Sequence, residues 1–115
     1  MITVTFNKET GGIRSVEVTG HGNYGDSGED IVCAGISILT ITILNGLTEI
    51  VGVTDMKREV AEGYTSFTIP PLMDPMMQDR ANVLLETYEL GVRATESAYG
   101  DYVQVIENCG GENDD

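Results

Sequence analysis

An uncharged stretch at residues 31–48 constrains the fold most, because 22% of the chain's residues are charged. Apolar residues recur in it at three- and four-residue spacing, which predicts one helix ending near Val51. Asp30 directly precedes the stretch and is well placed to cap that helix. The residues that this spacing places on one helix face are Ile36, Leu39, Ile43, Leu44, Leu47 and Ile50.

Eighteen uncharged residues also reach the lower length limit of a membrane-spanning helix. Polar residues such as Ser37, Thr40, Thr42 and Asn45 interrupt this run. We therefore expect a buried helix, one face of which can line a dimer interface, and no membrane contact. The alternative, a membrane-attached regulator, predicts that the protein partitions into detergent.

Two pairs of alternating segments predict β-hairpins. Residues 2–6 and 13–19 are separated by Gly11 and Gly12, and residues 56–61 and 64–69 flank a second turn. Each pair has the period of two that a half-buried strand requires. The sequence therefore predicts four strands in two hairpins.

Asp74 and Pro75 open a second predicted helix, which Gly100 stops before a short strand at residues 102–106. The order β-β-α-β-β-α-β predicts an α+β fold of two layers, with both helices packed on one face of a mainly antiparallel sheet. Residues 1–109 form one domain in this interpretation, and residues 110–115 form an acidic disordered tail. The expected inward stripe of the second helix is Met77, Ala81, Leu84, Leu85, Tyr88, Val92 and Thr95.

Charge and cysteine content limit the partners. Six basic and nineteen acidic residues give a formal charge of −13, which disfavours nucleic acid and favours a basic protein partner. The N-terminus lacks the features of a secretion signal, so we expect a cytoplasmic protein with Cys33 and Cys109 as thiols. One histidine and two cysteines fall short of a structural zinc site, and we expect neither a metal nor a cofactor.

The loop at residues 20–28 holds four glycines, a density that suits a mobile lid over an extended peptide. Gly20, Gly22 and Gly25 also match the G-x-G-x-x-G string of dinucleotide-binding folds. That context fails, because a hairpin precedes the string and the predicted helix begins about five residues after it. Tyr24 can pack on the peptide or simply anchor the loop.

Cys33 and His21 are the candidate catalytic pair. A helix N-terminus and a nearby imidazolium both favour a thiolate, and His21 is the only histidine. Asp30 can orient the imidazole as well as cap the helix. Main-chain N–H groups near Cys33 and Ala34 would stabilise the oxyanion. The plain alternative is that Cys33 is a small buried hydrophobe and His21 a surface residue.

Residues 20–37 resemble the signature of the ribosomal-processing cysteine protease family, called Prp. The shared pattern is a Gly-His opening, a tyrosine with two glycines, then Asp-Ile-Val-Cys-Ala leading into a helix with a serine four residues beyond the cysteine. The resemblance implies catalysis by His21 and Cys33, with Asp30 in support. Ser37 then bonds the substrate, or else the backbone one turn earlier.

The resemblance also implies a substrate and an assembly. Members of that family remove a short N-terminal extension from large-subunit ribosomal protein number twenty-seven, in support of ribosome assembly, and are typically homodimers. The alternative function is a non-catalytic module that binds a peptide or the ribosome through the same loop. The expected substrate-binding residues are Gly20, Gly22, Tyr24, Gly25, Ala34 and Ser37.

Overall fold

The first two strands form the hairpin that their alternating sequence predicts. In the computed structural model, which describes residues 1–20 and 27–110, β1 (Ile2–Glu9) pairs antiparallel with β2 (Gly12–Thr19). The side chains of Ile2, Val4 and Phe6 are fully buried. One face of β1 therefore belongs to the core, as the period of two requires.

Three further strands complete the sheet. β3 (Lys57–Ala61) and β4 (Tyr64–Thr68) form the second predicted hairpin, and β4 pairs antiparallel with β2. β5 (Val103–Cys109) lies parallel to β1 at the opposite edge. The strand order is β3-β4-β2-β1-β5, so the sheet is mainly antiparallel with one parallel pair.

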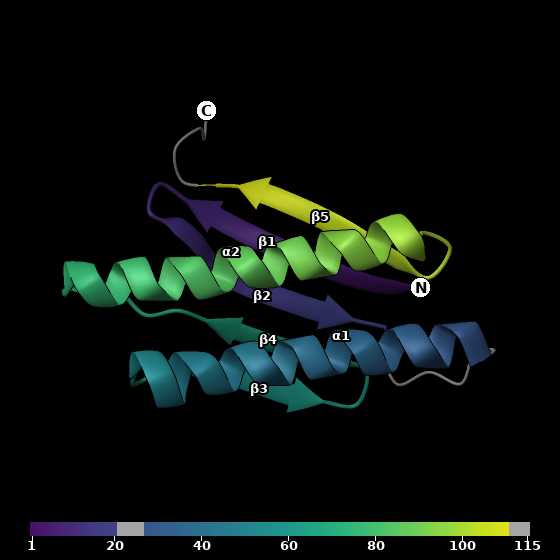
Figure 1. Cartoon of the computed structure of the whole chain (residues 1–115), viewed down its shortest axis with the longest axis horizontal. Coiled ribbons are helices and arrows are strands. Elements are labelled where there is room, and N and C mark those ends of the chain that lie inside the picture. Colours follow the sequence, from purple (N-terminus) through teal and green to yellow (C-terminus); the bar gives the residue numbers. More distant parts are fainter. Residues whose placement is uncertain (21–26, 111–115) are drawn as a thin grey trace.

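Both helices cover the same face of this sheet (Figure 1). α1 (Ser27–Asn45) continues into a π-helical segment, Gly46–Val51, and lies above β3 and β4. α2 (Pro75–Ala98) lies above β1 and β2 and begins as predicted, because Asp74 accepts a hydrogen bond from the main-chain N–H of Met76 at 3.0 Å. The two helices run in opposite directions.

The core lies between the sheet and the helix layer, which confirms the predicted α+β fold. Phe67 of β4 and Val16 of β2 contribute from the sheet, and Ile36, Leu47 and Leu85 contribute from the helices. All five side chains are almost completely inaccessible to water. Burial of this apolar surface is the main force that holds the two layers together.

Two predicted details are wrong. β5 was expected to end at Ile106 but extends to Cys109, because its last residues pair with the end of β1, where Cys109 faces Lys8. Ile50 was expected in the core but is 79% exposed. The π-helical turn rotates successive side chains less than an α-helix does, so Val51 faces the core in its place.

The predicted cap of the first helix is also wrong. α1 begins at Ser27, so Asp30 is its fourth residue and not the residue that precedes it. Acidic residues are favourable in the first turn because they face the positive end of the helix dipole. The carboxylate of Asp30 is thus suited to its position without being the cap.

Asp30–Val51 is long and apolar enough, by length and composition, to cross a membrane. A core helix of a globular domain passes the same test. Here Val32, Ile36 and Leu47 of this segment are buried against the sheet and the second helix. Burial accounts for the apolar character of this inner face, whereas Ile31, Ile38 and Ile41 on the outer side of the helix remain exposed.

Candidate active site

Asp30, Cys33 and Ser37 share one flank of α1. Their spacing of three and then four residues places them one above another along the helix. Cys33 is half-buried and packs against the core, Ser37 is half-buried, and Asp30 is exposed. The helix thus presents a thiol with a carboxylate one turn before it and a hydroxyl one turn after it.

The expected oxyanion donors are not where the sequence placed them. Only the N–H groups at the very start of a helix lack an intrahelical acceptor, and α1 starts at Ser27. The N–H groups of Cys33 and Ala34 lie in the second turn, inside the hydrogen-bonded part of the helix. The expectation assumed a helix that starts about four residues later than Ser27, where α1 begins.

The predicted residues His21, Gly22, Tyr24 and Gly25 lie outside the described residues. Gly20, directly before them, has a φ of +88°, and a Cβ there would collide with the main-chain oxygen of Met1. Its N–H donates to the carbonyl of Gly63 at 3.0 Å. Glycine is therefore required at the point where the chain leaves β2 toward His21.

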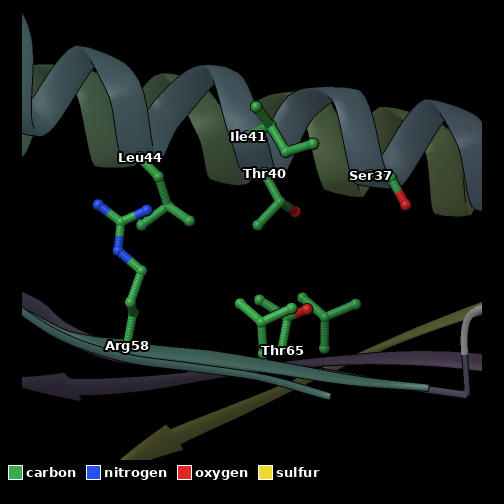
Figure 2. A pocket seen from close by; sticks show the side chains of 8 residues that line it. Ser37, Thr40, Ile41, Leu44, Arg58 and Thr65 are labelled. Atoms are coloured by element: carbon green, nitrogen blue, oxygen red, sulfur yellow. The ribbon is translucent and has the colours of Figure 1, made fainter. Parts of the chain in front are cut away.

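A slot opens between α1 and the β3–β4 hairpin, next to Ser37 (Figure 2). Its floor is formed by Val18, Thr65 and Val60, one residue each from β2, β4 and β3, which are direct neighbours across the sheet. Its volume is about 250 Å³. The side chains above the floor are those of Ser37, Thr40, Ile41 and Leu44.

Arg58 of β3 closes one end of the slot, beneath Leu44 (Figure 2). Sequence reasoning missed Arg58 and all three floor residues. Alternation along residues 56–61 places Arg58 and Val60 on the same strand face, which is the signal that was present. What the sequence lacked was the order of the strands, and hence which face α1 covers.

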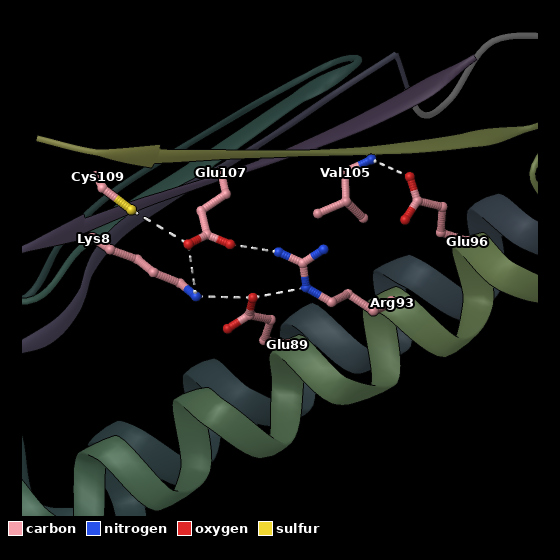
Figure 3. A network of polar contacts seen from close by, with 7 residues as sticks. All are labelled: Lys8, Glu89, Arg93, Glu96, Val105, Glu107 and Cys109. Atoms are coloured by element: carbon pink, nitrogen blue, oxygen red, sulfur yellow. Dashed lines mark hydrogen bonds and ion pairs between the residues drawn. The ribbon is translucent and has the colours of Figure 1, made fainter.

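A second polar cluster joins α2 to β5 (Figure 3). Glu89 accepts from Lys8 at 3.0 Å and from Arg93 at 2.8 Å, and Arg93 also donates to Glu107 at 2.8 Å. Cys109 donates to Glu107 at 3.3 Å. This hydrogen bond and the charge of Lys8 hold the pKa of Glu107 below its usual value.

The cluster lies at the β5 edge, whereas Cys33 lies on the helix above the β3 edge. Cys33 and Cys109 are therefore far apart and are not joined by a disulfide. Within residues 1–20 and 27–110, no three His, Cys, Asp or Glu side chains gather as metal ligands would. The thiol of Cys33, on the flank that faces the slot, is the chemically distinctive group of the described site.

Comparison with known proteins identifies the family of this chain. A family model described as cysteine protease Prp matches residues 1–104 of the chain. The ribosomal processing cysteine protease Prp of Bacillus subtilis (strain 168) is 31% identical over 99 residues, which cover 84% of this chain and 88% of that protein.

Solved structures share the fold. The crystal structure of SMU.848 from Streptococcus mutans has a TM-score of 0.82 and 26% identity, and the match covers 96% of each chain. Prp from S. aureus in complex with a substrate peptide has a TM-score of 0.74 and 24% identity, over 94% of this chain and 100% of that one. With the family model spanning residues 1–104 and the B. subtilis relative 31% identical, this chain belongs to the Prp family of cysteine proteases.

Proposed function

We propose that this cysteine protease removes the short N-terminal extension of large-subunit ribosomal protein number twenty-seven, and so supports ribosome assembly. The B. subtilis relative is named a ribosomal processing protease, and the S. aureus structure holds a substrate peptide. The observation that carries the proposal is the flank of α1 on which Asp30, Cys33 and Ser37 lie in line beside the slot.

In the proposed reaction His21 takes the thiol proton of Cys33, and the sulfur attacks the carbonyl carbon of the scissile bond. A C–S bond forms, the C–N bond breaks, and His21 gives its proton to the leaving amine. Water then hydrolyses the thioester, with its proton passing through His21 back to the Cys33 sulfur. Asp30, one turn before Cys33, supports the pair by orienting the imidazole.

Substrate binding is assigned to the surroundings of this pair. The hydroxyl of Ser37 bonds the peptide one turn beyond the thiol, and the exposed Ala34 leaves room for the peptide main chain beside Cys33. Gly20, held at the end of β2, directly precedes the glycine-rich segment that we assign to peptide binding. Gly22, Tyr24 and Gly25 belong to that segment.

The charge of the chain supports a basic protein substrate. A formal charge of −13 attracts a ribosomal protein at low ionic strength and repels free nucleic acid. We place the reaction in the cytoplasm, away from membranes, where the thiol stays reduced. Binding of the substrate should therefore weaken as salt is added.

The test incubates the extended ribosomal protein from the same organism with the wild-type chain, Cys33→Ala and Cys109→Ala, and identifies products by mass spectrometry. We expect cleavage by the wild-type chain and by Cys109→Ala, and none by Cys33→Ala. Equal cleavage by Cys33→Ala would overturn the assignment of the nucleophile. An intact ribosomal protein in every reaction would overturn the proposed substrate.

We further propose a homodimer formed through the outer face of the helix layer. Ile31 and Ile38 of α1 and Met76, Val83 and Leu90 of α2 are large apolar side chains that point away from the core into solvent. On α2 they recur every seven residues, on the side opposite the buried stripe. A second copy of the chain can cover such a face by two-fold symmetry.

Sedimentation equilibrium tests the dimer. We expect a dimer for the wild-type chain and for the control Gln104→Glu on β5, and monomers for Ile38→Glu and Leu90→Glu. The control introduces the same charge at an exposed position of another element. A monomeric wild-type chain, or dimers in all four proteins, would contradict the proposed interface.

A further inference from the structure

The slot described above is apolar and open to water at the edge of the sheet. Val60 is 70% exposed and Ile41 is 58% exposed, although both side chains line the slot. β3 is the last strand of the sheet on this side, so no further strand among the described residues covers the mouth. Two large aliphatic side chains thus face a common cavity and are still exposed to solvent.

The volume of the slot limits its occupant. Sites for cofactors and drug-sized ligands have volumes of about 300–1,000 Å³. At about 250 Å³, the slot fits one or two amino-acid side chains. Val18, Ile41, Leu44 and Val60 give it an aliphatic surface, so an aliphatic side chain suits it best. Its polar lining groups are the hydroxyl groups of Ser37, Thr40 and Thr65 and, at one end, the guanidinium of Arg58.

Arg58 adds a charge to this apolar site. Of the six basic side chains, Lys8, Arg14 and Arg93 form ion pairs. Within the described part of the chain, no carboxylate forms an ion pair with Arg58. A guanidinium offers a rigid set of donors that fits a carboxylate, and Arg58 places such a group at one end of the slot.

The slot continues the flank that carries the thiol. Ser37 lies one turn beyond Cys33, at a rise of about 6 Å, and Leu44 lies about 16 Å beyond it. An extended peptide advances about 3.3 Å per residue. A peptide that follows α1 from Cys33 therefore reaches the middle of the slot after about three residues and Arg58 after about five.

We propose that the slot is a specificity pocket for the peptide substrate. It takes an aliphatic side chain about three residues from the scissile bond, and Arg58 binds an acidic side chain about five residues from that bond. The inference rests on the proposed role of Cys33 as the nucleophile. It adds a sequence preference that the nucleophile and its helix alone would not produce.

The test measures which sequences are cleaved in a randomised synthetic peptide library. For the wild-type chain we expect enrichment of Leu, Ile or Val at the nearer position and of Asp or Glu at the farther one. Arg58→Glu should reverse the charge preference toward Lys and Arg. Lys57→Glu is the matched control, because Lys57 is the adjacent residue of β3 and its side chain points to the opposite face.

Kinetics with matched peptides give the size of the effect. Replacing Glu by Lys at the farther position should lower kcat/KM about threefold to tenfold through a higher KM. Val60→Phe should shift the nearer preference to smaller side chains, and Val60→Ala to larger ones. Both substitutions are at an exposed position, so a melting temperature close to that of the wild-type chain is expected.

The outcomes separate this inference from the proposed function. Cleavage of the library without cleavage of the ribosomal protein would reject that substrate but would not contradict the specificity pocket. Library profiles that are identical for the wild-type chain, Arg58→Glu and Lys57→Glu would overturn the pocket. If no peptide is cleaved, the affinities of Cys33→Ala for Glu- and Lys-containing peptides decide, and equal affinities would likewise overturn it.

Discussion

The hydroxyl groups of Thr40 and Tyr88 lie 2.9 Å apart and join α1 to α2 inside the core. Thr40, which is 4% exposed, also donates to the carbonyl of Ile36 at 2.8 Å. Its single hydrogen is therefore used, and the O–H of Tyr88 donates to Thr40. Because Thr40 also lines the slot, this bond fixes one wall of the proposed pocket.

Removing the hydroxyl of Thr40 should lower the free energy of unfolding more than removing the hydroxyl of Tyr88. Thr40→Val leaves the buried O–H of Tyr88 without its acceptor and should lower the free energy of unfolding by about 1–3 kcal/mol. Tyr88→Phe leaves Thr40 bonded to Ile36 and should cost about 1 kcal/mol. Urea unfolding of both variants and the double variant measures the coupling, and strictly additive losses would contradict it.

Alkaline pH should weaken the folded state through Tyr88. Burial raises the pKa of this phenol from 10.0 to about 12, against a smaller opposite effect of the hydrogen bond with Thr40. The protonated phenol of Tyr88 contributes its full share of the free energy of unfolding below pH 10. That share is lost as the pH rises toward 12, by up to about 1.4 kcal/mol per pH unit. Urea unfolding from pH 9 to 12 should show a shallower decline for Tyr88→Phe. Parallel declines would show that Tyr88 ionises as readily in the folded state.

Gly20→Ala should destabilise the chain more than Gly11→Ala. The first change forces a side chain into a left-handed backbone and against the Met1 carbonyl, at a cost of at least about 1–2 kcal/mol. Gly11 has open space around it and no such backbone, so it is the matched control. Thermal unfolding measures both, and cleavage should fall with Gly20→Ala because His21 follows directly. Equal melting temperatures for Gly20→Ala and Gly11→Ala would contradict the claim that the fold requires glycine at position 20.

Acid should remove the contribution of Glu107. Its pKa is lowered by the hydrogen bond from Cys109 and by the charges of Lys8 and Arg93, so its stabilisation is present above pH 4.5 and is lost as the pH falls through the lower folded value. Glu107→Gln should slightly lower the melting temperature at pH 7 and match the wild-type chain in strong acid. Glu86→Gln, at an exposed position of α2, is the control for the charge change. A pH-independent difference would contradict the ion-pair explanation.

Local periodicity predicted the elements of this fold, because helices and strands repeat within a few residues. It did not predict that β5 lies parallel to β1, since that pairing joins the two ends of the chain. The exposure of Ile50 was missed for a related reason. An ideal helix period places Ile50 inside, and the π-helical turn that moves it outside has no distinct residue pattern.

The candidate site was predictable where it depends on one helix. The spacing of Cys33 and Ser37 places them on a common flank wherever that helix begins. The assignment of the oxyanion donors depended on where α1 begins, and residue types alone do not determine the first residue of a helix. Arg58 and Val60 could not be assigned, because the slot needs three strands and a helix brought together by tertiary packing.

The two thiols should react with iodoacetamide in the order opposite to their exposure. Cys109 is exposed and Cys33 is half-buried, so accessibility alone favours Cys109. Cys109 is also hydrogen-bonded to the carboxylate of Glu107, and a neighbouring negative charge disfavours its thiolate. If His21 takes the proton of Cys33, that residue should be labelled first despite its burial, because the thiolate is the reactive form. Mass spectrometry of the native protein over time measures both rates, and a urea-unfolded sample gives the rates without the fold. Faster labelling of Cys109 in the native protein would contradict an activated Cys33.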